Sequence, residues 1–283
     1  MQVQWYPGHM AKAKRMLKEQ LKLVDIVIEV LDARIPISSG NPDLNTLIRG
    51  KPRLIVLNKS DLADSAENKK WIKYFADSGF KTVAVNSSLR EGMDQLTKAA
   101  SQLAEVKMQQ ITAKGLRPRP VRAMVIGVPN VGKSSLINAL VRKTSTKTAN
   151  KPGVTKGKQW VRVLPNLELL DTPGLLWPKF DSLQVGFNLA VTGAISDQVY
   201  DLVEAAMELL EFLKNYAAKN LMEKYKLKDL NLPNYDLLEE IGRKRGLLRA
   251  GGVVEIEKTA LMLLQEFRQG KLGKLTLEKV AAE

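Results

Sequence analysis

At its centre the chain reads Gly127-Val128-Pro129-Asn130-Val131-Gly132-Lys133-Ser134. The pattern G-x-x-x-x-G-K-S places glycines where backbone N–H groups can turn inward around phosphate oxygens, beside a helix N-terminus. The apolar residues 123–126 before it predict a strand, and residues 135–143 after it predict a helix. Because the pattern forms a phosphate-binding loop in that context, we predict such a loop at residues 127–134.

The residues of this loop have separate expected roles. Lys133 is predicted to reach the β- and γ-phosphates of a nucleotide, and the Ser134 hydroxyl is predicted to bind Mg²⁺. Six consecutive residues are expected to surround the phosphates: Asn130, Val131, Gly132, Lys133, Ser134 and Ser135. The predicted ligand is therefore a nucleoside triphosphate with its metal ion.

Two later segments predict the parts that respond to the γ-phosphate. In Asp171-Thr172-Pro173-Gly174, Asp171 is expected to hold Mg²⁺ through water and the Gly174 N–H to face the γ-phosphate. Thr155, in the polar stretch of residues 144–159, is the candidate for the second direct Mg²⁺ ligand. Other threonines lie in the same stretch, so the choice among them stays open.

A guanine-recognition motif is predicted at Asn58-Lys59-Ser60-Asp61, directly after the apolar residues 54–57. A carboxylate can accept both the ring N–H and the exocyclic NH₂ of guanine, whereas adenine lacks this donor pair and would leave Asp61 unpaired. Asn86 and Ser87 follow another apolar run, where a backbone N–H can meet guanine O6. The residues expected at the base are Asn58, Lys59, Ser60, Asp61, Asn86 and Ser87.

The apolar pattern predicts an α/β fold. Short apolar strands alternate with helical stretches, which is typical of a mostly parallel sheet with helices on both faces. The predicted strands are residues 25–32, 54–57, 82–85 and 123–126, followed by an antiparallel pair at 160–164 and 168–170. The predicted helices between them include residues 65–76 and 94–108. Ligands of such sheets bind at the carboxyl ends of the strands, where the motifs above lie.

The order of the motifs is rotated. The base-recognition motif precedes the phosphate loop, although in the usual arrangement of a GTP-binding domain it follows. The proline-rich residues 114–120 form the connector that such a rotation requires. We therefore predict a circularly permuted P-loop GTPase domain over residues 1–178, with a basic amphipathic helix at residues 8–23.

Residues 179–283 show a different pattern and are predicted to form an all-helical domain. Apolar residues recur there at helical spacing, from Val199 to Leu213 and from Ile256 to Phe267. This region also carries basic residues that are candidates for gripping RNA phosphates: Arg243, Lys244, Arg245, Arg249, Arg268, Lys271 and Lys274. An aromatic fraction of only 6% favours readout of structured RNA by shape over base stacking.

The composition narrows the class of protein. The 283 residues carry a formal net charge of +14, which favours a polyanionic partner over a merely solvated basic surface. The chain has no cysteine, which excludes disulfides and thiolate metal sites and fits a reducing cytoplasm. No apolar run is long enough to span a membrane, so we expect a cytoplasmic protein without membrane partners, and a monomer.

These motifs resemble the circularly permuted GTPases of the YlqF/YawG group. The resemblance rests on the rotated order, on Asp32-Ala33-Arg34-Ile35-Pro36, and on Trp5-Tyr6-Pro7-Gly8-His9-Met10, and it covers essentially the whole chain. It implies a GTP-hydrolysing factor for late assembly of the large (50S) ribosomal subunit, which binds rRNA and is stimulated by the particle. The alternative is a GTP-binding tether for RNA or protein that does not hydrolyse its ligand.

The source of hydrolytic power is a separate question. Many small GTPases place a glutamine after D-x-x-G to orient the attacking water, but here Leu175 stands there. His9 is the only histidine, and the resemblance implies a role for it in hydrolysis; it could instead bond backbone or contact rRNA. The resemblance also implies that Asn130 helps bind K⁺ beside the phosphates, although it could simply shape the loop. The predicted catalytic set is His9, Lys133, Thr155 and Gly174.

Overall fold

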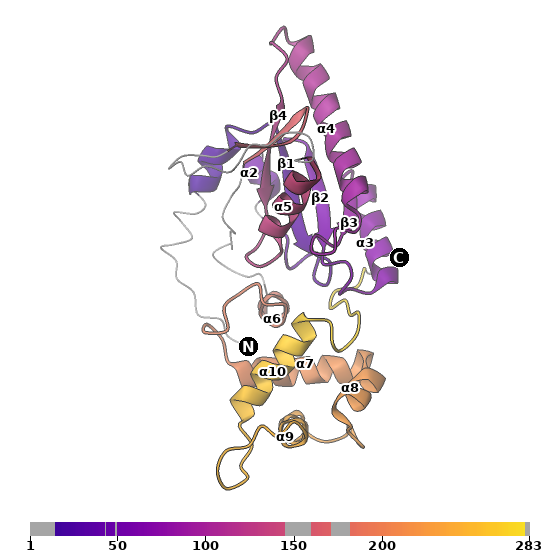
Figure 1. The fold of residues 1–283 in the computed structure, drawn as a ribbon, viewed down its shortest axis with the longest axis vertical. Coiled ribbons are helices and arrows are strands. Elements are labelled where there is room, and N and C mark those ends of the chain that lie inside the picture. The colour runs from indigo at the N-terminus through magenta and orange to yellow at the C-terminus, as the bar shows by residue number, and fades with distance from the viewer. Residues whose placement is uncertain (1–14, 43, 49, 145–159, 171–181, 281–283) are drawn as a thin grey trace. The chain divides into compact units, whose positions relative to one another are not determined.

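The computed structural model describes residues 15–42, 44–48, 50–144, 160–170 and 182–280. These residues form two compact units: one contains residues 15–170 together with residues 278–280, and the other contains residues 182–277. Figure 1 shows the first unit built around a sheet and the second built from helices. Four predicted site residues lie outside the described residues: His9, Thr155, Asp171 and Gly174.

The sheet of the first unit has six strands in the order β3-β2-β1-β4-β6-β5. Their bounds are β1 Ile26–Asp32, β2 Arg53–Asn58, β3 Lys81–Val85, β4 Val121–Ile126, β5 Trp160–Leu164 and β6 Leu167–Leu170. All neighbouring pairs are parallel except β5 and β6, which are antiparallel. This arrangement confirms the predicted α/β class and the predicted hairpin. The carboxyl ends of β2 and β1 are level, because Asp32 is paired with Asn58 in the register.

Helices cover this sheet. Helix α3 (Ser65–Asp77), helix α4 (Met93–Ala113) and helix α5 (Lys133–Thr144) lie close to the predicted positions, and a short α2 spans Leu44–Ile48. Of the predicted helix at residues 8–23, only residues 15–21 are described as helical. The residues of β1 are all buried, so this central strand is covered on both of its faces.

Two clusters of apolar side chains fix the helices against the sheet. Leu17 and Leu21 pack with Val27 of β1 and Met124 of β4. Further along β1, Leu31 packs with Leu57 of β2 and with Trp71 and Phe75 of α3. Fully burying one such aliphatic side chain contributes about 1.5–3 kcal/mol. The end of β1 is therefore a firmly packed platform for the residues that follow it.

The second unit is helical throughout its named elements. It consists of α6 (Leu183–Val191), α7 (Leu202–Tyr216), α8 (Ala218–Tyr225), α9 (Asn234–Lys244) and α10 (Ile256–Arg268). Helix α7 packs against each of the other four helices. Its apolar face, which includes Leu209, Leu210 and Leu213, is fully buried, as the helical spacing in the sequence predicts. No described helix is both long and apolar enough to cross a membrane.

Candidate nucleotide-binding site

The predicted phosphate loop connects β4 to α5. Its backbone needs unusual conformations, because Asn130 and Gly132 both have positive φ values, of 57° and 97°. A side chain at Gly127 would collide with the carbonyl oxygen of Val30 in β1. A side chain at Gly132 would collide with Nδ2 of Asn58. The two glycines of the motif are thus required by close approach to neighbouring strands.

Asn58 joins three loops at the carboxyl edge of the sheet. Its Nδ2 donates to the carbonyl of Val131 in the phosphate loop at 2.7 Å. Its Oδ1 accepts from the backbone N–H of Ser87, after β3, at 3.1 Å. Asn58 is almost fully buried, so both bonds are shielded from competing water. The base-recognition motif and the phosphate loop, separated in the sequence by 73 residues at this contact, therefore form one site.

Lys133 starts α5 and lies inside the loop. Its Nζ donates to the carbonyl oxygens of Gly127 at 3.1 Å and Val128 at 2.8 Å, and the side chain is buried. The Lys133 ammonium therefore lies inside the predicted phosphate-binding loop. Ser134 and Ser135 follow at the exposed start of the same helix, with N–H groups that belong to a helix N-terminus.

Asp61, the carboxylate predicted to recognise guanine, has one oxygen without a partner in the described part of the chain. Its Oδ1 is buried and has no hydrogen-bond partner among the described residues. Leaving a buried acceptor without a donor costs about 1–3 kcal/mol. The motif around it is held from both sides: the Ser60 N–H donates to Val85 at 3.1 Å, and the Ser60 carbonyl accepts from Asn68 of α3 at 3.0 Å. A guanine ring would supply the missing donor.

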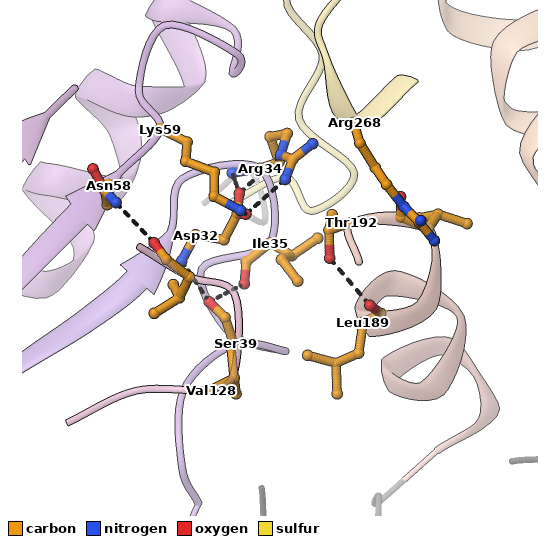
Figure 2. Close-up of polar contacts among 12 residues, drawn as sticks. Asp32, Arg34, Ile35, Ser39, Asn58, Lys59, Val128, Leu189, Thr192 and Arg268 are labelled. Carbon is orange, nitrogen blue, oxygen red and sulfur yellow. Dashed lines mark hydrogen bonds and ion pairs between the residues drawn. The ribbon is translucent and has the colours of Figure 1, made fainter. Parts of the chain in front are cut away.

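Lys59 is anchored by a network that the sequence alone did not indicate. It has a positive φ of 58°, and its Nζ lies 3.0 Å from Oδ2 of Asp32, at the end of β1. Asp32 also accepts two bonds from the guanidinium of Arg34, at 2.9 and 2.7 Å. Figure 2 shows Lys59 and Arg34 both reaching the Asp32 carboxylate.

The charge of Asp32 is maintained despite its position. Burial by itself would raise the pKa of Asp32, but the charges of Arg34 and Lys59 outweigh burial and hold the pKa well below its ordinary value. The carboxylate is therefore ionised at neutral pH and can fix the Lys59 ammonium. In the sequence, the segment Asp32-Ala33-Arg34-Ile35-Pro36 is the signal for this role, because it places a carboxylate and a guanidinium two residues apart at the end of a strand.

The segment after β3 is organised by Asn86. Its Oδ1 accepts from the backbone N–H groups of Ser88 and Leu89, both at 3.1 Å. Its Nδ2 is buried without a hydrogen-bond partner among the described residues. Because the Ser87 N–H is engaged by Asn58, Ser87 acts here as part of the loop junction.

The basic residues of the helical unit differ in their surroundings. Arg268 is not a surface residue for phosphates, because it donates to Asp197, to the Tyr200 hydroxyl and to carbonyls at the end of α6. Arg243, Lys244 and Arg245 are paired with Glu239, Glu240 and Glu266, respectively. Arg249, Lys271 and Lys274 are exposed and make no ion pair within the described part of the chain.

Comparisons with known proteins identify the family of this chain. A family model described as a 50S ribosome-binding GTPase matches residues 122–232, beginning at the strand that leads into the phosphate loop. The ribosome biogenesis GTPase A of Bacillus cereus is 46% identical over 98% of this chain and 94% of its own length. The protein of the same name from Thermotoga maritima is 31% identical, over 97% of this chain and 94% of its own length.

A solved structure extends the match to three dimensions. The GNP-bound YlqF from T. maritima has a TM-score of 0.67 and 29% sequence identity, and the match covers 95% of this chain and 98% of that one. The sequence similarity extends over nearly the whole chain and includes the phosphate-loop and base motifs. This chain is therefore a GTP hydrolase with a G domain fold. The chain belongs to the ribosome biogenesis GTPase A family.

Proposed function

We propose that this protein is a GTPase of late large-subunit (50S) assembly, which binds rRNA and hydrolyses GTP faster on the particle. The observation that carries the nucleotide part is the Asn58 junction, which brings the base motif to the phosphate loop beside the unpaired Oδ1 of Asp61. Support for the ribosomal part comes from the names of the relatives and from the net charge of +14.

The guanine site consists of groups with assigned tasks. Asp61 accepts the two N–H donors of guanine, Asn58 and Lys59 hold the loops, and Asn86 with Ser87 closes the side of the pocket at β3. Residues 130–135 bind the phosphates through backbone N–H groups and the Lys133 ammonium. Phosphate arriving in the loop would replace the carbonyl oxygens of Gly127 and Val128 as partners of that ammonium.

Mg²⁺ fits the start of α5. The Ser134 hydroxyl is exposed directly after Lys133, which is the place for a metal ligand beside the β- and γ-phosphates. Thr155 and, through water, Asp171 complete the proposed ligand set from outside the described residues. When bound there, the ion would neutralise charge that develops on the phosphates. Asn130, at its left-handed position in the loop, is the proposed K⁺ contact; equal rates in K⁺ and Na⁺ buffers would reject that role.

His9 is the proposed source of water orientation, because Leu175 cannot bond a water. Lys133, Thr155 and Gly174 complete the proposed catalytic set by stabilising the γ-phosphate. A His9→Ala variant is expected to bind GTP normally and to lose the turnover that the particle stimulates. Unchanged stimulated turnover would remove this assignment.

We assign a separate function to each of the two units. Residues 1–178 are proposed as the GTPase domain and residues 179–283 as the RNA-binding domain. Within the latter, Leu248 pairs with Val254 around a tight turn that exposes Arg249, and this turn lies beside the end of α9. Arg249, Lys271 and Lys274 are the proposed phosphate contacts, since their charges are not committed to ion pairs within the described residues.

One experiment tests both parts of the proposal. Purified small and large subunits are sedimented with the protein in the presence of a GTP analogue, GDP or no nucleotide, and GTPase rates are measured in K⁺ buffer with each subunit. We expect preferential binding to the large subunit with the analogue and a rate increase of about tenfold or more, equivalent to about 1.4 kcal/mol of barrier. Lys133→Ala is the control without nucleotide binding. Equal behaviour with both subunits, or a rate that neither changes, would contradict the proposal.

A further inference from the structure

The last described residues return to the sheet unit. Glu278, Lys279 and Val280, here called the C-terminal segment, belong with residues 15–170 and not with the helices that precede them. Val280 packs against the apolar cluster at the end of β1 that includes Leu31 and Trp71. The C-terminal segment therefore has a defined seat on the GTPase unit.

Glu278 is bound by a set of donors that suits a carboxylate. Its side chain accepts from the backbone N–H of Ile37 at 2.7 Å and of Ser38 at 2.9 Å, and also from the Ser38 hydroxyl. Its carbonyl accepts from Nε1 of Trp71 at 3.0 Å. Two adjacent N–H groups and a hydroxyl directed at one carboxylate form an anion-binding concavity with charge-assisted bonds. The contact is thus built for a negative side chain.

The turn that holds Glu278 leads directly to Lys59. In this turn the Ser39 hydroxyl donates to the Ile35 carbonyl at 2.7 Å and accepts from the Asp32 N–H at 3.0 Å. Figure 2 shows Ser39 beneath Ile35 and next to Asp32. Since the Asp32 carboxylate holds the Lys59 ammonium, a restraint on residues 35–39 is also a restraint on the base motif.

A second path runs through α3. Trp71, which donates to the Glu278 carbonyl, lies one turn after Asn68 on the same helix. Asn68 donates to the Ser60 carbonyl, inside the base motif, at 3.0 Å. Glu278 therefore contacts both supports of the segment Asn58–Asp61: the turn after β1 and the helix that follows the motif.

We propose that Glu278 is a positioning residue for guanine recognition, acting through the turn at residues 35–39 and through α3 on the loop that carries Lys59 and Asp61. The inference rests on the guanine site proposed above. It assigns to the end of the chain a share in nucleotide retention, because loss of the Glu278 bonds loosens both supports of the base motif. The path meets the phosphate loop only through the bond from Asn58 to Val131, and the printed partners of Lys133 are Gly127 and Val128. We therefore expect the effect on nucleotide binding and not on the chemical step.

The test compares three single variants in the full chain. Glu278→Ala removes the acceptor, Glu278→Gln keeps an acceptor without the charge, and Lys279→Ala alters the exposed neighbouring residue as a control. The measurements are the dissociation rate of a fluorescent GDP, the basal KM and kcat for GTP, and amide hydrogen exchange at Ile37 and Ser38. For Glu278→Ala we expect the GDP dissociation rate and the KM for GTP to rise about three- to tenfold, with kcat unchanged. A tenfold change corresponds to about 1.4 kcal/mol. Glu278→Gln should fall between Glu278→Ala and the wild type.

The outcomes separate this inference from other readings. A merely structural contact would lower the thermal unfolding midpoint of Glu278→Ala and leave GDP dissociation and KM at wild-type values, which would overturn the inference. Unchanged exchange at Ile37 and Ser38 in that variant would also overturn it, since the two N–H groups would then not depend on Glu278. If the wild type itself fails to select GTP over ATP, the proposed guanine site falls; if only Glu278→Ala behaves as wild type, the positioning role alone falls.

Discussion

At the scale of single residues, Asn58 joins the loops of the proposed nucleotide site. Its side-chain amide donates to the Val131 carbonyl and accepts from the Ser87 N–H, so it holds three loops in one arrangement. Asp61, by contrast, is left with a buried oxygen unpaired within the described residues. Asn58 is therefore a support whose hydrogen bonds are made within the protein, and Asp61 carries the oxygen that we propose to bind guanine.

Replacement of Asp61 by asparagine is expected to exchange guanine for xanthine. An amide can accept the ring N–H and donate to the carbonyl that xanthine carries in place of the guanine NH₂, but it cannot accept two donors as a carboxylate does. GTP affinity should fall about 100-fold, about 2.7 kcal/mol, while XTP affinity rises. Titration with GTP, XTP and ATP measures this. Asp64→Asn is the matched control, because Asp64 caps α3 and asparagine caps equally well; an Asp61→Asn chain that still prefers GTP would refute the assignment.

Gly132→Ala is expected to disconnect the phosphate loop from the base motif. The new methyl group would collide with Nδ2 of Asn58, so either the Asn58–Val131 bond breaks or the loop moves. Gly115→Ala is the control, because Gly115 also has a positive φ, of 74°, but open space around it. Both variants pay about 1–2 kcal/mol for the left-handed backbone. Only Gly132→Ala should also lose nucleotide binding. Thermal unfolding measures the loss of stability in both variants, and calorimetric titration measures the loss of nucleotide affinity. Equal losses of affinity in the two variants would indicate an effect of backbone strain alone.

At the scale of elements, the carboxyl ends of β1 and β2 form one polar assembly. Register pairs Asp32 with Asn58, and the next residue, Lys59, folds back to the Asp32 carboxylate. A buried ion pair contributes little net stability, but removal of one partner leaves the other charge uncompensated, at a cost of about 3–5 kcal/mol. The ion pairs thus fix the geometry of the base motif, and substitution of any of the charged partners is expected to destabilise the fold.

Asp32→Asn is expected to lower the free energy of unfolding by about 3 kcal/mol at pH 7. Because the folded-state pKa of Asp32 lies below its unfolded value, near 3.9, the ionised carboxylate stabilises the protein fully above about pH 5. This contribution is lost as the pH falls toward the folded-state pKa. The difference in stability between wild type and variant should therefore stay constant from pH 8 to pH 5 and narrow below about pH 4.

Urea unfolding at a series of pH values measures this difference. Asp77→Asn, an exposed change of the same type at the last residue of α3, should run parallel to the wild type at every pH. A gap between Asp32→Asn and wild type that widens in acid would contradict the sign of the pKa shift.

The elements themselves were largely predictable, and the links between them were not. Apolar runs bounded by polar residues located the strands within one or two residues, since burial on both faces leaves a strong pattern. The motifs also predicted that the loop of Asn58 meets the phosphate loop, and the Asn58–Val131 hydrogen bond joins these two loops. The sequence could not predict that Lys59 bonds to Asp32, or that Glu278 bonds to Ser38 across 240 positions, because such contacts depend on strand order and on where the chain returns. The sequence also suggested Arg268 as a phosphate contact, whereas its guanidinium donates to the carbonyls of Ala190 and Val191 at the end of α6.

At the scale of the whole molecule, the permuted order of the motifs changes which segment of the chain follows residues 171–174. The family-model match starts at β4 and runs forward past the sheet, while Asn58–Asp61 precede it in the sequence. By sequence, residues 171–174 stand only a few positions before α6, which begins the helical unit. The response to the γ-phosphate that we propose for Gly174 would thereby be connected along the chain to the domain proposed to bind RNA.

This connection predicts that the overall dimensions of the protein depend on its nucleotide. Small-angle scattering profiles with a GTP analogue and with GDP are expected to differ if Gly174, which precedes the helical unit in the sequence, responds to the γ-phosphate as proposed. Lys133→Ala, measured at the same nucleotide concentrations, should give one profile in both conditions. Since a ligand can shift such an equilibrium only by its differential affinity for the two arrangements, the protein should also bind the analogue and GDP with different affinities. Identical wild-type profiles, both in free solution and on the large subunit, would show that nucleotide state is not transmitted through this connection.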